Sequence, residues 1–181
     1  MNLIMNSLLD KKRILIIGNP GSGKSTLAAK LAELLNLPLI SLDRHYWKSG
    51  WVPTPPEEWR KQVMELVAAD KWIIDGNYDS SSDIRFPRAE AIIFLDFPTS
   101  ICLWRAMRRM ICSYGKVRPE MAEGCPEKIN WLFIKWILNF RKDVRRNIFN
   151  SVDKYFRGEC LIILKSPRQV DDFIHQLEKT K

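Results

Sequence analysis

The chain has 181 residues, the size of one ordinary domain and too long for a small fold held together by disulfides or metal. Apolar residues make up 46% and charged residues 28%, so the composition is globular and excludes a disordered or low-complexity chain. The 29 Lys and Arg against 21 Asp and Glu give a net charge of +8. This excess favours an anionic partner: nucleic acid, a membrane surface or a phosphorylated small molecule.

Neither a spanning helix nor a secretory signal is expected. The longest uninterrupted apolar runs, Ala91–Leu95 and Cys160–Leu164, are far shorter than the roughly 20 residues that cross a bilayer. Residues 1–10 lack a basic region ahead of an apolar block. The four cysteines show no zinc-ligand spacing, so we expect reduced thiols. We therefore expect a cytoplasmic protein without a membrane partner.

Strand-like and helix-like segments alternate along the whole chain. Apolar residues at spacings of three and four predict helices between short apolar runs that predict strands. This alternation predicts a single three-layer α/β domain over residues 1–181, with a five-stranded parallel sheet. The predicted strands are Arg13–Ile17, Leu39–Leu42, Trp72–Asp75, Ala91–Asp96 and Cys160–Leu164.

A glycine-rich segment follows the first predicted strand and fits the pattern G-x-x-x-x-G-K-[ST] at every fixed position. Its glycines allow backbone N–H groups to face a polyphosphate, and the following helix directs its positive end at the same anion. Lys24 would bind the β- and γ-phosphates, and the Ser25 hydroxyl would ligate Mg²⁺. The residues expected to bind ATP are Gly18, Asn19, Pro20, Gly21, Ser22, Gly23, Lys24, Ser25 and Thr26.

Three aspartates, Asp43, Asp75 and Asp96, come at the carboxyl ends of predicted strands. Parallel α/β sheets bind their ligands at this edge. The carboxylates could hold waters of Mg²⁺ or accept a proton from an attacking hydroxyl, and each could equally be a helix-capping aspartate. We expect Asp75 and Asp96, with Ser25, at the metal, and Asp43 at the acceptor.

The segment after Asp43 combines aromatic residues with a basic one. Trp47 and Trp51 could stack on a planar group while Arg44 pairs with a phosphate. The alternative is that the tryptophans form the small core of an inserted helical segment, which we favour for Trp59 and leave open for the other two.

Most of the positive charge lies in residues 105–146, which contain eleven Lys and Arg and four acidic residues. An arginine inserted beside a transferring phosphoryl group can raise the rate by about 10³ to 10⁵. We expect this role for Arg105, Arg141 and Arg145, since they flank a Gly- and Pro-containing lid and helices would hold them rigidly. Lys24 completes the expected catalytic set. The remaining basic residues are interpreted mainly as a solvated face.

These features favour an ATP- and Mg²⁺-dependent phosphotransferase, because no GTPase base-reading motif occurs and the chain is short for a motor. The alternative is a nucleotide-gated DNA-binding regulator that affects DNA topology through the basic segment. The phosphoryl acceptor and the oligomeric state are left open.

The chain resembles the adenylate-kinase-like group of nucleoside monophosphate and small-metabolite kinases. From about Arg13 onward it resembles more closely the bacterial family of DNA topology modulation (FlaR-related) proteins. The segments that carry the resemblance are Gly18–Thr26, Leu42–Trp47, Trp72–Tyr78, Phe94–Pro98 and Arg141–Arg145.

The resemblance implies a strand order of 2-3-1-4-5, a helical acceptor insert at about 43–71 and a short lid at about 113–130 that closes over ATP. It places Asp75 at the magnesium site and adds Tyr78 to the acceptor-binding residues. Asn77 and Tyr78 depart from the adenylate kinase pattern, and Arg85 comes too late to match its arginine. AMP is therefore not indicated as the acceptor.

Overall fold

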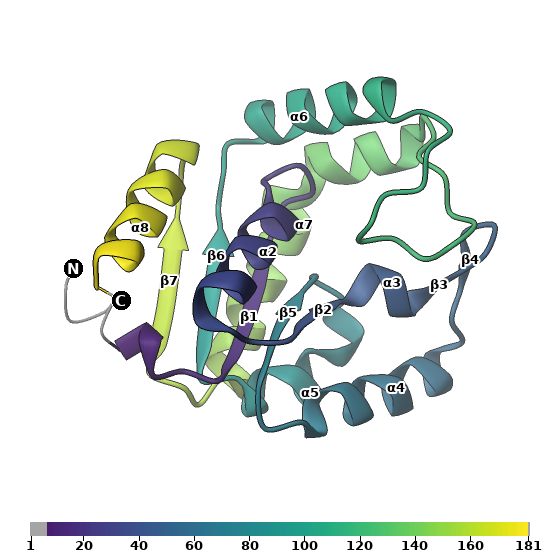
Figure 1. Cartoon of the computed structure of the whole chain (residues 1–181). Coiled ribbons are helices and arrows are strands. Elements are labelled where there is room, and N and C mark those ends of the chain that lie inside the picture. The colour runs from purple at the N-terminus through teal and green to yellow at the C-terminus, as the bar shows by residue number, and fades with distance from the viewer. Residues whose placement is uncertain (1–6, 181) are drawn as a thin grey trace.

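A five-stranded parallel sheet runs through the centre of the molecule in the order β2-β5-β1-β6-β7 (Figure 1). In chain order this is 2-3-1-4-5, so the expected sheet and strand order are confirmed. This is a computed structural model that describes residues 7–180, and most of the segment weighed as a secretory signal lies outside these residues. The strands are β1 (Arg13–Gly18), β2 (Leu39–Ser41), β5 (Trp72–Asp75), β6 (Ala91–Leu95) and β7 (Cys160–Leu164).

Strand β1 is the centre of the sheet and pairs in parallel with both β5 and β6, with Ile14 opposite Ile73 and Ile16 opposite Ile93. Every residue of β5 and β6 is buried. Strands covered by helices on both faces lose the polar alternation of a half-exposed strand. This is why short, continuous apolar runs marked these strands in the sequence.

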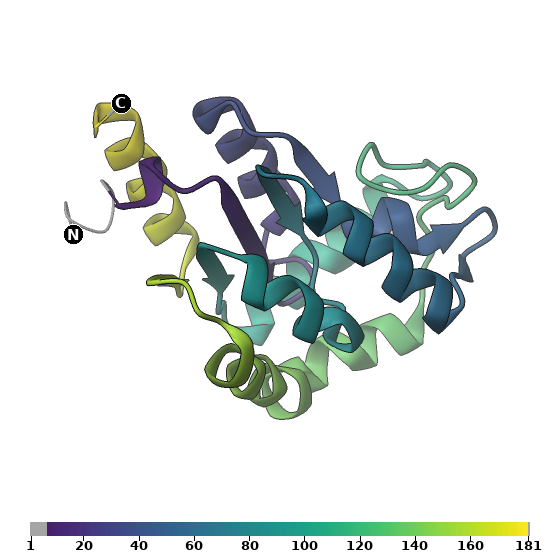
Figure 2. The same cartoon turned by 90° about the horizontal axis from the view of Figure 1, so that it is seen from below.

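Helices cover both faces of the sheet (Figure 2). One core joins alternate residues of β1 to α2, α6 and α8, and the other joins the remaining residues of β1 to α4 and α7. Side chains of a strand alternate between its faces, so β1 contributes to both cores. The helices are α2 (Lys24–Leu35), α4 (Pro56–Ala68), α5 (Ser82–Arg85), α6 (Thr99–Cys112), α7 (Trp131–Tyr155) and α8 (Pro167–Thr180), with 3₁₀ turns η1 (Asp79–Ser81) and η2 (Phe86–Arg88).

The segment between β2 and α4 is more than the helical insert expected at 43–71. It holds the short helix α3 (Leu42–Tyr46) and an antiparallel hairpin of β3 (Trp47–Lys48) and β4 (Val52–Pro53). Gly50 and Trp51 both have positive φ, at 77° and 65°, which allows the tight turn. Strands of two residues carry no readable periodicity, so the sequence did not reveal this hairpin.

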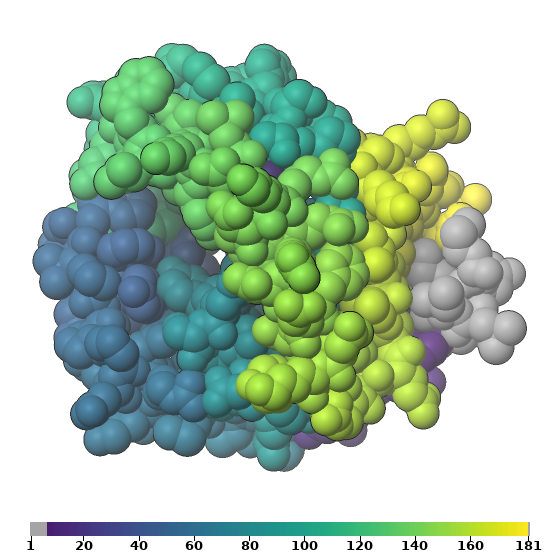
Figure 3. Space-filling view, turned by 180° about the vertical axis from the view of Figure 1, so that it is seen from behind, coloured from purple at the N-terminus to yellow at the C-terminus, as the bar shows by residue number. Residues whose placement is uncertain are grey.

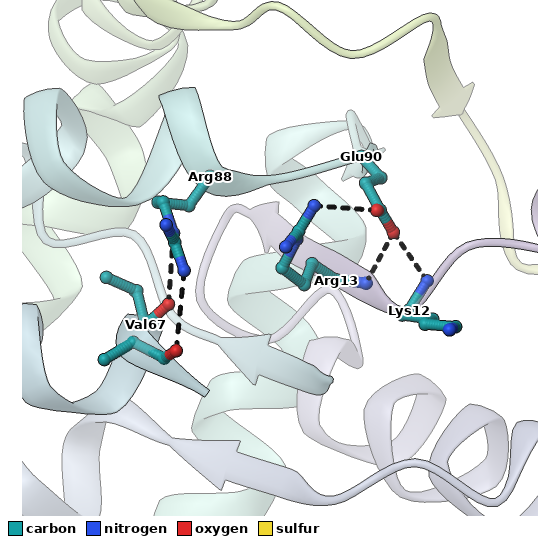
Figure 4. A network of polar contacts seen from close by, with 6 residues as sticks. Lys12, Arg13, Val67, Arg88 and Glu90 are labelled. Atoms are coloured by element: carbon teal, nitrogen blue, oxygen red, sulfur yellow. Dashed lines mark hydrogen bonds and ion pairs between the residues drawn. The ribbon is translucent and has the colours of Figure 1, made fainter. Parts of the chain in front are cut away.

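The amino ends of the strands are held by a polar network around Glu90 (Figure 4). Its carboxylate accepts hydrogen bonds from the backbone N–H groups of Lys12 and Arg13, at 2.7 and 3.1 Å, and from the Arg13 guanidinium at 2.8 Å. Nearby, Arg88 donates to the carbonyl oxygens of Val67 and Ala68 at the end of α4. These contacts lie at the opposite edge of the sheet from the phosphate loop.

The candidate functional residues expected at the carboxyl ends of the strands therefore lie at the end of the sheet opposite the Glu90 network. Figure 1 shows α6 and the N-terminal half of α7 lying across the carboxyl ends of the strands. Within residues 7–180 no helix is both long and apolar enough to cross a membrane. The four cysteines are free thiols.

Candidate functional site

The glycine-rich loop between β1 and α2 has the backbone that its pattern predicts. Gly21 and Gly23 have φ values of 81° and 96°, which residues with a side chain rarely adopt. A Cβ on Gly21 would also collide with the carbonyl oxygen of Cys102 in α6. Helix α2 begins at Lys24, directly after this turn. The loop can therefore direct backbone N–H groups and a helix N-terminus at one anion.

Lys24 is partly buried and lies near two carboxylates. Its Nζ donates to the carbonyl oxygen of Asn19 at 3.3 Å. Burial lowers the pKa of Lys24, and Asp75 and Asp43 act in the opposite direction. An ammonium with a single protein acceptor retains donors for an anionic ligand. Asn19 and Ser22 also have buried side-chain atoms without a hydrogen-bond partner, which suits a loop shaped around a ligand.

Asp75 at the end of β5 is 6% exposed, and its Oδ1 has no hydrogen-bond partner. Burial raises the pKa of Asp75, while Lys24 and the Ser25 hydroxyl lower it. Mg²⁺ bound with a nucleotide keeps several waters and takes few protein ligands. Residues 7–180 contain no group of three or more His, Cys, Asp or Glu placed to hold a metal ion without such help. The unpaired oxygen of Asp75 and the Ser25 hydroxyl fit a magnesium ion that arrives with the nucleotide.

The loop after Asp75 is hydrogen-bonded to the start of the phosphate loop. The Asn77 amide accepts from the N–H of Gly18 and donates to the carbonyl oxygen of Gly18, both at 2.9 Å. Asn77 therefore ties the end of β5 to the start of the phosphate loop. In the sequence, Asn77 belonged to a segment that carries the family resemblance and departed from the adenylate kinase pattern, and neither feature indicated this structural role.

Arg85 in α5 is fully buried and fixes the same loop. Its guanidinium donates to the carbonyl oxygens of Gly76, Asn77 and Tyr78 and to the Ser81 hydroxyl. Burial lowers the pKa of Arg85 to about 10. Arg85 is a structural residue, and no sequence signal distinguished it from a surface arginine of a short helix.

Tyr78 and Asp43 form a hydrogen-bonded pair in the same cavity as the phosphate loop. The Tyr78 hydroxyl donates to Oδ1 of Asp43 at 2.6 Å. Burial and the neighbouring Asp43 raise the pKa of Tyr78, so this hydroxyl stays a donor. Tyr46 and Trp59 pack against the Tyr78 ring, with centroids 4.7 and 5.0 Å away. One oxygen of Asp43 is thereby oriented by a rigid aromatic side chain.

The three tryptophans of the insert occupy two kinds of position, the core and the cavity wall. Trp59 is buried in the core, as expected. Trp47 and Trp51 line the cavity, and their rings lie 5.5 Å apart in an edge-to-face arrangement. Arg44, expected beside the acceptor, is exposed and does not line the cavity. Its position in the first helical turn after β2 turns the side chain to solvent.

The segment expected as a lid, residues 113–130, is docked on the hairpin of the insert. The Trp51 indole donates to the carbonyl oxygen of Pro126 at 3.0 Å, and the N–H of Gly50 donates to Gly124 at 2.9 Å. Met121 and Cys125 are buried in a small cluster with the two cavity tryptophans. The lid and the hairpin therefore form one wall of the site.

Three arginines from α6 and the lid line the cavity: Arg105, Arg109 and Arg118. Arg105 donates to the carbonyl oxygen of Ser22 in the phosphate loop at 3.3 Å. Arg109 and Arg118 both pair with the buried carboxylate of Glu127, at 3.0 and 2.9 Å. Arg105 was expected here, whereas Arg109 and Arg118 were not. Arg109 lies one helical turn after Arg105, and that spacing was the available signal.

The structure does not bring Arg141, Arg145 or Asp96 to the cavity, although all three were expected at the phosphates or the metal. The Arg145 guanidinium donates to both carboxylate oxygens of Asp96, at 3.0 and 2.9 Å. Arg141 lies 3.8 Å from the same carboxylate. The hydrogen bond to Asp96 raises the pKa of Arg145. These residues join α7 to the end of β6 and leave Asp96 without an oxygen free for a metal.

Together the phosphate loop, the strand ends, the insert and the lid enclose a cavity of about 1020 Å³. Seen from behind, the surface is hollowed between α7 and the insert (Figure 3). A cavity of this size holds more than one small molecule. The phosphate-binding residues and the Tyr78–Asp43 pair line it together.

The fold and the phosphate loop define this chain as a P-loop NTPase domain of the α/β class. A model of the family described as ATPase family associated with various cellular activities (AAA) matches residues 14–96. No curated protein matches the chain in sequence.

Solved structures share the fold over nearly the whole chain. Shikimate kinase from Acinetobacter baumannii in complex with shikimate is 15% identical, with a TM-score of 0.55, covering 97% of this chain and 96% of that one. Shikimate kinase from Bacteroides thetaiotaomicron is 17% identical, with a TM-score of 0.52, covering 94% and 98%. A gluconokinase from Sinorhizobium meliloti 1021 is 17% identical, with a TM-score of 0.51, covering 93% and 94%. At these identities the likeness is one of fold.

Proposed function

We propose that the protein is an ATP- and Mg²⁺-dependent phosphotransferase that transfers the γ-phosphoryl group of ATP to a hydroxyl of a nucleotide or small hydroxylated metabolite. One observation carries the proposal: the phosphate loop and the Tyr78–Asp43 pair line the same cavity. A protein that only binds a nucleotide needs no oriented carboxylate in the cavity that holds its phosphate loop. We place the reaction in the cytoplasm, where ATP is available.

The donor side holds the triphosphate. The loop N–H groups and the N-terminus of α2 bind the phosphates, and Lys24 contacts the β- and γ-phosphates. Ser25 and Asp75 would hold Mg²⁺, which supplies charge neutralisation on the phosphate oxygens when bound. Asn77 keeps the loop in register with the metal-binding strand end through its two bonds to Gly18.

The acceptor side supplies the base. The acceptor hydroxyl attacks the γ-phosphorus and gives its proton to Asp43, while the bond from that phosphorus to the β,γ-bridging oxygen breaks and ADP leaves. Tyr78 orients the Asp43 carboxylate. Trp47 and Trp51 provide a flat apolar wall for the acceptor.

The arginines and the lid act on the moving group. Arg105 is held against the phosphate loop, and Arg109 comes from the next turn of the same helix. Their positive charge would stabilise the negative charge on the transferring oxygens. The lid, docked on the hairpin, would keep water from competing with the acceptor hydroxyl.

The named neighbours support the small-metabolite choice of acceptor, because shikimate and gluconate kinases act on hydroxylated molecules within this fold. Membership of the DNA topology modulation family stays a resemblance. DNA binding stays a second hypothesis: six of the eleven basic residues in the segment 105–146 line the cavity or contact Asp96, which leaves fewer for a nucleic acid backbone.

The decisive variant is Lys24→Ala. It removes the ammonium that contacts the phosphates, so ATP affinity should fall by at least about tenfold and transfer should fall to background. ATP binding is measured by calorimetry, and transfer is measured across nucleoside monophosphates, nucleosides and small hydroxylated metabolites. Asp43→Asn is the matched variant: it should bind ATP normally and lose about 10² to 10⁴ in transfer rate.

The ATP site and the catalytic base can each be contradicted separately. Lys24→Ala protein that turns over ATP like the parent would overturn the donor site. If Asp43→Asn transfers phosphoryl groups as fast as the parent, Asp43 is not the base.

A further inference from the structure

Apolar side chains gather on the outer face of α6 and the start of α7, away from the cavity. On α6, Trp104 and Ile111 are 61% and 66% exposed, and on α7, Trp131 and Leu132 are 76% and 78% exposed. Tyr114, just after α6, is 64% exposed. None of the five lines the cavity. We call these five residues the outer apolar face.

The outer apolar face lies at one end of the molecule. Helices α6 and α7 pack against each other, and the N–H of Gly115 donates to the carbonyl oxygen of Glu127 at 2.9 Å. This bond brings the end of α6 next to the start of α7. Figure 1 shows α6 and the N-terminal half of α7 together at the top of the molecule. The exposed residues therefore belong to one region and are not scattered single side chains.

Positive charge surrounds the outer apolar face. Arg108, Lys116 and Lys135 are all exposed, and no ion pair is found for them among residues 7–180. The Arg108 guanidinium lies 5.6 Å from the centre of the Trp104 ring. Between residues 104 and 138 the exposed acidic side chain in this description is Glu123. The surplus positive charge that the phosphate-binding arginines do not use is therefore turned outward here.

We propose that the outer apolar face and its basic rim bind the surface of an anionic lipid membrane. Tryptophan, tyrosine and aliphatic side chains on a helical surface, with lysine and arginine beside them, match the boundary between acyl chains and anionic headgroups. The lipid surface supplies the complementary negative charge. This departs from the expectation of no membrane partner, which rested on the absence of a spanning helix and said nothing of peripheral contact.

The charge and the apolar side chains of the outer apolar face favour a membrane over other binding partners. A second copy of this chain, placed symmetrically, would bring the basic rim of one copy against that of the other. A nucleic acid would satisfy the basic rim and the aromatic rings, but it offers nothing to Ile111 and Leu132. The face is also separate from the catalytic cavity, so the proposal does not depend on the proposed function.

Vesicle co-sedimentation of the full chain tests the proposal. The protein should sediment with vesicles of phosphatidylglycerol and phosphatidylcholine, should stay in solution with phosphatidylcholine alone, and should be released as salt rises. Trp131→Ser combined with Leu132→Ser should abolish sedimentation. Arg108→Gln and Lys135→Gln should each weaken binding about fivefold, the effect of one basic residue near an anionic surface.

The control lies on α4, where Met64 and Lys61 are also exposed. Met64→Ser combined with Lys61→Gln should sediment like the parent, and circular dichroism shows whether each variant is folded. The proposal is overturned by a parent that ignores anionic vesicles, or by sedimentation that Trp131→Ser and Leu132→Ser leave unchanged. It is equally overturned if those two substitutions instead dissolve a dimer or abolish binding of a single-stranded DNA oligonucleotide while vesicles stay unbound.

Discussion

Asp75 and Asp96 are the same residue at the same edge of the sheet, and their surroundings differ. Asp75 is the last residue of β5 and Asp96 directly follows β6, the two strands that flank β1, and each is 6% exposed. Asp75 keeps an oxygen without a partner and faces the cavity, whereas both oxygens of Asp96 accept from Arg145. One carboxylate is therefore available to a ligand, and the other joins the sheet to a helix.

The arginines show the same contrast. Arg105 of α6 contacts the phosphate loop, and Arg145 of α7 contacts Asp96. Both are arginines on helices beside the lid, so residue type and spacing could not separate them. A charged side chain at the carboxyl ends of the strands is therefore available to a ligand or used in a structural ion pair according to the element that packs against it.

Arg105→Gln gives the largest expected effect. Removing a guanidinium placed beside the phosphate loop should lower the transfer rate by about 10³-fold. The free energy of unfolding should change little, because the Arg105 side chain makes one hydrogen bond and one ring contact in the described structure. Steady-state kinetics and urea unfolding measure the two quantities. Arg108→Gln, on the same helix but turned outward, serves as the control, and an equal loss in both variants would contradict the assignment.

Asp75→Asn should weaken Mg²⁺ in the nucleotide complex by about 10- to 100-fold, and Asp96→Asn should not. The pKa of Asp75 is raised by burial, so protonation removes its negative charge at a higher pH than for an ordinary carboxylate. Magnesium affinity should therefore be full above that raised pKa and fall as the pH is lowered through it. Magnesium titrations of ATP binding at several pH values measure this. A parent and an Asn variant with the same pH profile would remove Asp75 from the metal.

Arg145→Gln should lower the free energy of unfolding by about 1–3 kcal/mol, because it leaves the buried Asp96 carboxylate under-bonded. The partial exposure of Arg145 keeps the loss below that of a fully buried pair. Urea unfolding measures the loss, and the transfer rate at a temperature where the variant is folded should match the parent. Arg141→Gln, whose contact with Asp96 is longer and more exposed, should cost less than about 1 kcal/mol. A selective loss of transfer in Arg145→Gln would return this arginine to the catalytic set.

Trp51→Phe should produce a small loss in the free energy of unfolding, about 1 kcal/mol. It removes the indole N–H that donates to Pro126 while keeping an aromatic ring in the wall. Hydrogen exchange in residues 113–130 should become faster, since one tether of the lid is lost. Trp47→Phe is the control, because the hydrogen bond of the Trp47 side chain is to Tyr78 and not to the lid. If lid exchange does not change in Trp51→Phe, the lid is not held by this bond.

Local patterns predicted most of the framework. Continuous apolar runs marked the five strands because helices bury both faces of the sheet, and the phosphate loop was readable because its glycines, Lys24 and Ser25 are close together in sequence. The hairpin of the insert was not readable, because its strands are too short for periodicity. Arg85, Asn77 and Arg118 were missed because each works through partners distant in the chain or through backbone carbonyls.

The sequence by itself determined the α/β alternation, the phosphate loop and the uneven distribution of positive charge. Only the tertiary structure decided which charges meet which partners, because contacts between α6, α7, the lid and the sheet join residues far apart in the chain. The basic segment is thereby divided in three: arginines toward the cavity, arginines toward Asp96, and a basic rim around exposed apolar side chains. The net charge is only the sum of these groups. Packing against neighbouring elements decides which partner each charged side chain contacts.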